Sequence, residues 1–363
     1  MLDSIQLYFT SPSVDYTLPS YMPEAAFMAS NLHQKDYTVA LIGIPDSSNS
    51  ANEVRKHLYT LFGNFAQAKI CDLGNIKQGK TDKEMSIALE HVLQELSANN
   101  IPCVVFGGEQ WLSTIAFKAI SDSLDEVAVC VIDSKIDVGD MTESICSHSF
   151  LNQLSVHPQL ASLDIIGTQQ YYSTDLQRTF IRNHKGHNIR LAQARKDIFA
   201  LEPTLRYANL VSIDMSAIRM SDAPAANFPC PNGFAGEEAC QLARFSGYAD
   251  KTNIFMVSSW NTAKDPLHHT SLLVADIVWH FLEGVNSRQN EQPSTENPIY
   301  TKFVVQSDIN EEAIVFYHND NTDRWWIEIP TAQKARIFPC HLSDYEAICK
   351  NEIPELWLRF VYK

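Results

Sequence analysis

The sequence lacks the segments that carry proteins into or across membranes. Its longest apolar stretch, from Leu272 to Leu282, is interrupted by Asp276 and His280 and is shorter than a membrane-spanning helix. The N-terminal segment MLDSIQLYFT contains Asp3 and has neither a basic part nor a long apolar part. We therefore expect no signal peptide and no membrane insertion.

Basic clusters and paired cysteines are also missing. The net charge is −15 and no run of Lys and Arg stands out, which argues against a nucleic-acid partner. None of the eight cysteines belongs to a CxxC motif, so buried reduced thiols are favoured over zinc sites or disulfides. These absences predict a cytoplasmic protein. The cysteines are Cys71, Cys103, Cys130, Cys146, Cys230, Cys240, Cys340 and Cys349.

Short apolar runs alternate with longer helical patterns along most of the chain. The 363 residues, 45% hydrophobic and 20% charged, suffice for one large domain and a small appendage. Because the runs are apolar throughout, they predict parallel strands that are covered on both faces. Their alternation with helices predicts a doubly wound α/β domain. The predicted strands are Val39–Ile44, Lys69–Leu73, Cys103–Phe106, Val127–Ile132, Asp164–Gly167, Leu210–Ile213 and Ile254–Val257.

Three helical patterns have recognisable ends. The pattern Thr81–Asn99 begins at a threonine that can cap a helix, with Glu84 in its first turn. The patterns Gly236–Gly247 and His268–Gly284 each finish at a glycine that can stop a helix. We therefore expect three helices with these bounds.

The pattern of predicted elements changes after Asn286–Asn297, a polar stretch that has no periodicity. We expect an α/β domain over residues 1–287, a linker over 288–300 and a C-terminal α+β extension over 301–363. In the extension, three predicted strands precede one predicted helix. These are Lys302–Gln306, Glu312–His318, Arg324–Ile329 and His341–Lys350.

Polar segments follow four of the predicted strands. They are Gly107–Gln110, Asp133–Asp137, Asp214–Ser216 and Ser258–Asn261. In open α/β sheets, ligands bind at the carboxyl ends of the strands. Four such segments, each at a strand end, therefore predict a functional site at that edge.

These segments resemble the arginase, agmatinase and formimidoylglutamase family, the ureohydrolases, over roughly residues 35–285. The family carries GGDH, DAHxD and DxD motifs followed by an ENP-like turn. The stretch Pro231–Ala239 looks most like the formimidoylglutamase branch. The resemblance implies a three-layer arginase-like fold with a parallel doubly wound sheet. It also implies hydrolysis of a guanidine or amidine by a hydroxide held between two manganese ions.

The resemblance breaks at several positions that bind metal in the family. The two histidines fall on Gln110 and Lys135, and one aspartate falls on Ser216. The ENP glutamate falls on Ser259. The other aspartates are kept, so three of six family ligands differ here. The full set of equivalent positions is Gln110, Asp133, Lys135, Asp137, Asp214, Ser216 and Ser259.

A lysine among aspartates suggests a replacement for a metal ion. We hypothesise that the Lys135 ammonium takes the place of the second ion and pairs with the buried carboxylates. A structural ion pair is the plainer interpretation of the same cluster. We expect no cofactor, or at most one weakly bound Mg²⁺, Ca²⁺ or Mn²⁺. Its ligands would be Gln110, Asp133, Asp137 and Asp214.

Three functions follow as alternatives. The first is a non-catalytic binding or scaffold protein that has lost the two-manganese site and acts through a protein partner or as a homo-oligomer. The second is an active metal-dependent hydrolase of linear amidines such as formimidoylglutamate. The third is a small-molecule sensor that uses the retained pocket. Elsewhere, His268 and His269 open a helix without a matching carboxylate motif, so we expect solvated or capping histidines there.

Overall fold

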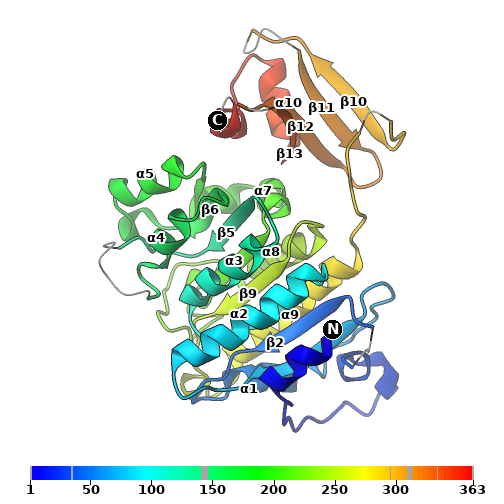
Figure 1. The fold of residues 1–363 in the computed structure, drawn as a ribbon, viewed down its shortest axis with the longest axis vertical. Helices are drawn as coiled ribbons and strands as arrows, with labels where there is room; N and C mark the ends of the chain where they lie inside the picture. The colour runs from blue at the N-terminus through cyan, green and yellow to red at the C-terminus, as the bar shows by residue number, and fades with distance from the viewer. Residues whose placement is uncertain are drawn as a thin grey trace.

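The main body of the protein is a sheet of nine strands between two layers of helices (Figure 1). The computed structural model describes residues 2–33, 36–139, 146–294, 296–308, 313–332 and 334–361. The strands lie in the order β1-β3-β2-β4-β9-β8-β5-β6-β7. All pairs from β2 to β9 are parallel, and β1 joins β3 antiparallel. The strands are β1 (Phe9–Thr10), β2 (Val39–Gly43), β3 (Ile70–Ile76), β4 (Cys103–Phe106), β5 (Val127–Ile132), β6 (Leu160–Thr168), β7 (Asn188–Arg190), β8 (Leu210–Asp214) and β9 (Ile254–Ser258).

Successive side chains of the central strands enter two separate hydrophobic cores. In β4, Val104 and Phe106 face one core while Cys103 and Val105 face the other. Because both faces of the sheet are covered, the strands are apolar throughout, as the sequence predicts. One core is closed by α1 (Ser50–Leu58), α6 (Leu191–Lys196), α7 (Glu202–Tyr207), α8 (Gly236–Tyr248) and α9 (His269–Asn286). The other is closed by α2 (Asp82–Ala98), α3 (Ser113–Ser121), α4 (Phe150–Ser155) and α5 (Asp175–Asn183).

The predicted helix ends are confirmed in one case and wrong in two. The Thr81 side chain accepts a hydrogen bond from the backbone of Glu84 and caps α2, as predicted. Gly247 and Gly284 do not stop α8 and α9, because both glycines lie within these helices. They lie where the two helices meet, and a Cβ added at Gly284 would be 2.8 Å from the Cα of Gly247. The glycines therefore permit close packing of the helices.

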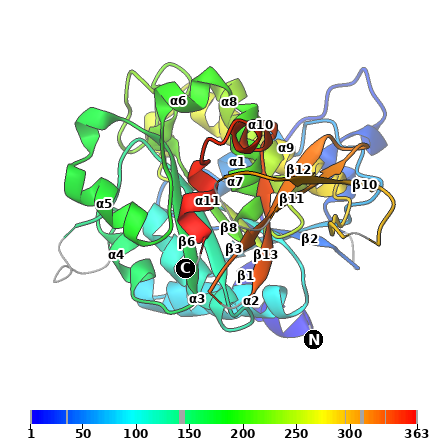
Figure 2. The same cartoon turned by 90° about the horizontal axis from the view of Figure 1, so that it is seen from above.

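A second sheet of four antiparallel strands forms the C-terminal extension. Seen from above, the extension lies over one end of the main body (Figure 2). Tyr207, which precedes β8, packs against Phe338 and Phe360, with ring centroids 5.4 and 5.7 Å apart. The extension therefore contacts the amino ends of the main strands. Its elements are β10 (Tyr300–Val305), β11 (Ile314–Asn319), β12 (Arg324–Pro330), β13 (Ala335–Cys340), α10 (Leu342–Cys349) and α11 (Glu355–Phe360).

The predicted fold class is confirmed: a parallel α/β sheet with helices on both faces and a small α+β extension. The domain bounds stay a prediction. Among the described residues, no helix combines the length and the apolar character needed to cross a membrane.

Candidate functional site

Two glycines shape the turn after β4. Gly107 and Gly108 adopt φ values of +104° and +69°, in a region that disfavours other residues. A Cβ at Gly107 would lie 2.8 Å from the carbonyl oxygen of Ile44. The turn delivers Gln110 to a fully buried position, where neither its Nε2 nor its Oε1 has a hydrogen-bond partner among the described residues. Such an orphaned amide is costly unless a group absent from the protein chain satisfies it.

Three aspartates gather at the carboxyl ends of β5 and β8. Asp133, Asp137 and Asp214 are 2%, 9% and 6% exposed. An oxygen of Asp133 accepts the hydroxyl of Ser216 at 3.2 Å and the backbone N–H of Lys135 at 3.1 Å. The structure therefore brings these predicted site residues together.

Burial makes this cluster difficult to ionise fully. It raises the pKa of Asp133, and the neighbouring Asp137 acts in the same direction. Burial also raises the pKa of Asp137 to about 7, against an opposing hydrogen bond with Asp133. It raises the pKa of Asp214 to about 7, with a further contribution from Asp133. Carboxylates that lie close together in a buried cluster disfavour one another's ionisation, so their pKa values rise.

Lys135 does not pair with these carboxylates. Its Nζ lies 4.5 Å from the ring centre of Phe228 and 5.8 Å from that of Tyr172. It forms no ion pair with a carboxylate of the described residues, and it acts on Asp137 only through longer-range attraction. The hypothesis of a close ion pair is therefore wrong, because the ammonium contacts aromatic faces instead of a carboxylate of the described residues.

Glu109, which precedes Gln110 in the turn after β4, accepts hydrogen bonds from neighbouring loops. Its two oxygens accept hydrogen bonds from Ser147 Oγ at 2.7 Å and from Asn227 Nδ2 at 3.0 Å. These residues and Phe228 line a cavity of about 530 Å³ in front of the strand ends. The three aspartates do not line it. The described cavity therefore stops short of the carboxylate cluster.

Ser259 lies at the end of β9 in a strained backbone conformation. Its φ is +73°, and only 2% of its surface is exposed. Its N–H donates to the Gly108 carbonyl at 2.9 Å, and its carbonyl accepts from Asn227 at 2.8 Å. Ser259 thus joins the β4 and β9 turns, but it offers no carboxylate to a cationic substrate.

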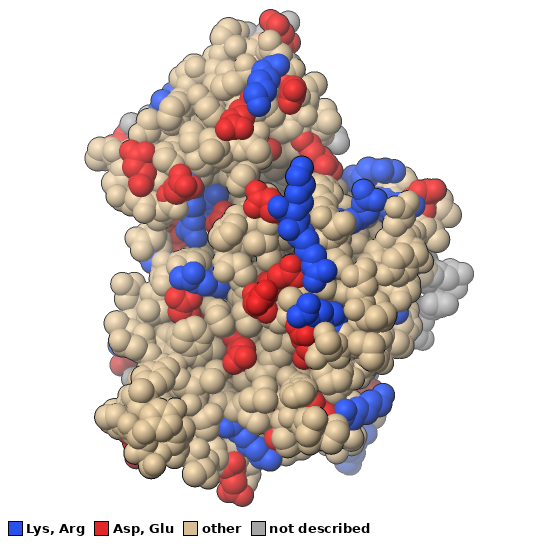
Figure 3. All heavy atoms as spheres, turned by 180° about the vertical axis from the view of Figure 1, so that it is seen from behind, with Lys and Arg blue, Asp and Glu red and all other residues tan. Residues whose placement is uncertain are grey.

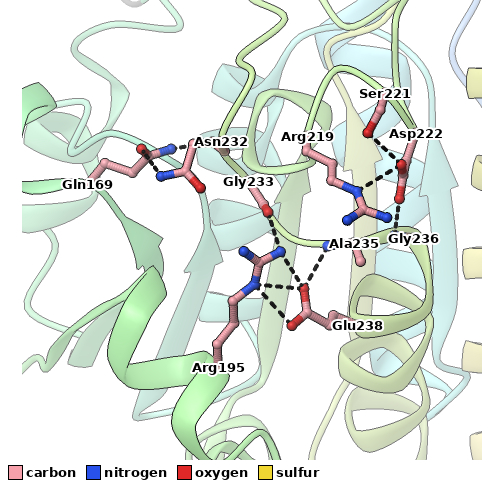
Figure 4. A network of polar contacts seen from close by, with 10 residues as sticks. All are labelled: Gln169, Arg195, Arg219, Ser221, Asp222, Asn232, Gly233, Ala235, Gly236 and Glu238. Atoms are coloured by element: carbon pink, nitrogen blue, oxygen red, sulfur yellow. Dashed lines mark hydrogen bonds and ion pairs between the residues drawn. The ribbon is translucent and has the colours of Figure 1, made fainter.

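The loop between β8 and α8 is held by two polar groups (Figure 4). Arg195 donates through Nε to both oxygens of Glu238, at 3.1 Å each, and through a guanidinium nitrogen to the Gly233 carbonyl at 2.6 Å. Asp222 accepts the N–H of Gly236 at 2.8 Å, at the start of α8. These contacts fix the segment that resembles the formimidoylglutamase branch.

One cluster of possible metal ligands lies elsewhere and was not predicted. Among the described residues, Glu53, His57 and His268 form the one group of three or more His, Cys, Asp or Glu ligand atoms within 4.8 Å of one another. The prediction for His268 was a solvated or capping histidine. The sequence offered one signal, the spacing of Glu53 and His57 on a single helix face. The partner His268 lies too far along the chain to be recognised.

Comparisons with known proteins identify the fold. A model described as the Arginase family matches residues 43–283. Formiminoglutamase from Trypanosoma cruzi with Mn²⁺₂ has a TM-score of 0.68 and 21% identity, over 72% of this chain and 99% of that one. Formimidoylglutamase from Bacillus subtilis has a TM-score of 0.66 and 18% identity, over 79% and 99%. Proclavaminate amidino hydrolase from Streptomyces clavuligerus has a TM-score of 0.63 and 17% identity, over 74% and 100%. A search of curated proteins found no match.

The comparison corrects the expectation about cofactors. No cofactor, or at most one weakly bound cation at Gln110, Asp133, Asp137 and Asp214, was expected. This expectation is contradicted, because structures similar to this chain include formiminoglutamases with Mn²⁺₂.

The donors of this chain nevertheless differ from the set of two histidines and four aspartates. Gln110 offers an amide and Ser216 a hydroxyl, and the Lys135 ammonium is turned to Phe228. The described residues therefore do not reproduce the ligand set that the resemblance implies for a manganese pair.

The matched family region begins at the end of β2 and continues into α9, so it contains all four turns of the carboxylate site. The strands β3 to β9, the helices α1 to α8 and the three aspartates all lie within this region. On these grounds, the chain belongs to the arginase family.

Proposed function

We propose that this arginase-family chain is a non-catalytic binding protein that has kept the hydrolase fold and given up turnover. The observation that carries the proposal is the position of Lys135. The resemblance assigns it to a metal-ligand position of the family at the end of β5. Its ammonium lies over Phe228, which lines the cavity of about 530 Å³. A fixed positive charge at this position disfavours the approach of a cationic amidine.

The neighbouring groups support the same interpretation. The Ser216 hydroxyl donates a hydrogen bond to Asp133. Both carboxylate oxygens of Glu109 accept hydrogen bonds, from Ser147 and Asn227. Ser259 provides no carboxylate for an amidinium. General-base or metal-assisted attack needs a water molecule positioned between activating groups and substrate, and the described cavity does not extend to the aspartates.

The partner class follows from the surface and the cavity. On the face drawn in Figure 3, Lys and Arg side chains are interspersed with Asp and Glu, so no continuous basic surface for nucleic acid is present there. The binding partner is therefore a protein, a second copy of the chain, or a small molecule in the cavity of about 530 Å³. The eight free cysteines support a reducing, cytoplasmic location.

The competing proposal is an active hydrolase of linear amidines, and the likeness to formiminoglutamases favours it. The two proposals differ in turnover. The purified chain should be assayed for release of formamide, ammonia or urea from formimidoylglutamate, agmatine and arginine, with Mn²⁺ in excess. The Bacillus subtilis formimidoylglutamase serves as the positive control.

We expect the control to turn over formimidoylglutamate and this chain to release no product above background. Turnover of about 1 s⁻¹ or faster on any of these substrates would show that the chain is an enzyme. Manganese occupancy is measured in the same samples, so that inactivity of a metal-loaded chain is distinguished from lack of metal.

A further inference from the structure

A histidine- and carboxylate-bearing cluster lies between α1 and α9, apart from the aspartates of β5 and β8. Glu53 and His57 are four residues apart on α1, so they project from one face of that helix. His268 immediately precedes α9, which packs against α1 over the same core. The packing of these two helices brings the three side chains together.

The distances between the ligand atoms suit a small tetrahedral ion. Oε1 of Glu53 lies 3.0 Å from Nδ1 of His268 and 3.7 Å from Nε2 of His57. The ligand atoms of a tetrahedral zinc ion lie about 3.3 Å apart, because zinc–nitrogen and zinc–oxygen bonds are about 2.0–2.2 Å long. The two separations bracket this value, and all three ligand atoms lie within 4.8 Å of one another.

One atom of the cluster lacks the partner that its burial demands. Nε2 of His57 is buried and has no hydrogen-bond partner among the described residues. A buried polar atom without a hydrogen-bond partner is unfavourable. A metal ion bound to this nitrogen would remove the cost. The atom lies on the side of the ring that faces Glu53.

The surrounding residues hold the other two ligands in place. Lys56 Nζ pairs with Oε2 of Glu53 at 2.6 Å, which leaves Oε1 directed at the histidines. His268 adopts a left-handed backbone with φ of +58°, and its N–H donates to the Asp265 carbonyl at 2.9 Å. Strained non-glycine residues persist where the surrounding structure fixes them.

We propose that Glu53, His57 and His268 form a zinc site whose fourth position is taken by water. Two imidazoles and one carboxylate are a ligand set that Zn²⁺ favours. The His268 side chain is 49% exposed, so the fourth position opens to solvent. The ion joins α1 to the loop between β9 and α9, and the same loop carries Ser259. This site is independent of the proposed function.

Zinc binding by the full chain tests the proposal. The protein is stripped with chelator, the chelator is removed, and Zn²⁺ is titrated against a competing metal indicator. The variants are His57→Gln and His268→Gln, and the matched control is His269→Gln, which removes the adjacent histidine outside the cluster. The parent and the three variants all keep the aspartates and the cysteines, which could also bind Zn²⁺. Only the differences in Zn²⁺ binding between these proteins therefore report on the proposed site.

We expect the parent and His269→Gln to bind about one Zn²⁺ more per chain than either cluster variant, or to bind it about 100-fold more tightly. With Co²⁺ as a substitute, the same difference should appear as a tetrahedral absorption spectrum without a thiolate charge-transfer band. Circular dichroism checks that each variant is folded. Equal binding by the parent and both cluster variants, or a spectrum carried by thiolate, would overturn the proposal.

Discussion

Lys135 and Arg55 show how differently two cations can be held within one protein. Arg55 is fully buried and donates through two nitrogens to the two oxygens of Asp72, at 2.8 Å each. Lys135 is partly exposed, and its described contacts are aromatic rings. Removing the Arg55 cation would leave Asp72 as a buried carboxylate without its ion-pair partner, whereas removing the Lys135 cation would not leave a carboxylate unpaired in this way.

Replacing each cation by methionine should separate the two cases. We expect Lys135→Met to lower the free energy of unfolding by no more than about 1 kcal/mol, the size of an exposed cation–π contact. Arg55→Met should lower it by about 3–5 kcal/mol, since Asp72 loses its partner. Urea denaturation at pH 7 without divalent cations measures both. A loss for Lys135→Met as large as that for Arg55→Met would restore the idea that the lysine neutralises the aspartates.

At the residue scale, the sequence predicts which residues stand at the site but not how they point. Asp133 and Asp214 follow apolar runs, and parallel strands must deliver such residues to one edge of the sheet. The direction of Lys135 depends on Phe228, which a distant loop supplies. The meeting of His57 with His268 depends on the packing of α1 against α9. Contacts of this kind follow from tertiary structure, which residue spacing does not reveal.

At the level of elements, α8 and α9 approach so closely that glycine is required at their contact. A Cβ at Gly284 would lie 2.5 Å from the Arg244 carbonyl and 2.8 Å from the Cα of Gly247. Gly236, at the start of α8, differs: there the nearest atom, 2.9 Å away, is the end of the flexible Leu273 side chain.

The substitution Gly284→Ala should therefore destabilise the protein although alanine is the better helix former. Overpacking costs about 1–3 kcal/mol, which exceeds the gain in helix propensity of up to about 1 kcal/mol. The control Gly236→Ala should change the free energy of unfolding by less than about 1 kcal/mol. Thermal and urea denaturation compare the two variants. If Gly284→Ala is as stable as the parent, the helices can separate without cost and the close contact is unimportant.

The elements that the sequence predicted best are the buried ones. The bounds of β4 and β5 agree with the prediction residue by residue, because uninterrupted apolar runs end in polar turns. The short strand β7 was missed, since only Ile189 of its three residues is buried. The strand β13 was also not predicted. It contains Pro339, and proline argues against a strand in the interior of a sheet. However, β13 is an edge strand, where proline is tolerated.

For the whole molecule, the extension is attached at the edge opposite to the carboxylate site. Arg359 of α11 donates to Asp164 of β6 at 2.7 Å, and both side chains are nearly buried, at 11% and 3% exposure. Arg336 of β13 pairs with Glu126, but these side chains are 33% and 51% exposed. One ion pair is therefore protected from water and the other is screened by it.

This difference predicts which pair holds the extension on the main body. We expect Arg359→Met to lower the free energy of unfolding by about 3 kcal/mol, because Asp164 stays buried without its cation. Arg336→Met should cost less than about 1 kcal/mol. Tryptophans lie in both parts, Trp325 and Trp357 in the extension and Trp260 beside the site, so fluorescence and circular dichroism together follow the unfolding of each. A single transition in the parent and two separate fluorescence transitions in Arg359→Met would mean that this pair couples the two parts. Equal losses for both variants would mean that the aromatic contacts of Tyr207 hold the extension and that the ion pairs are incidental.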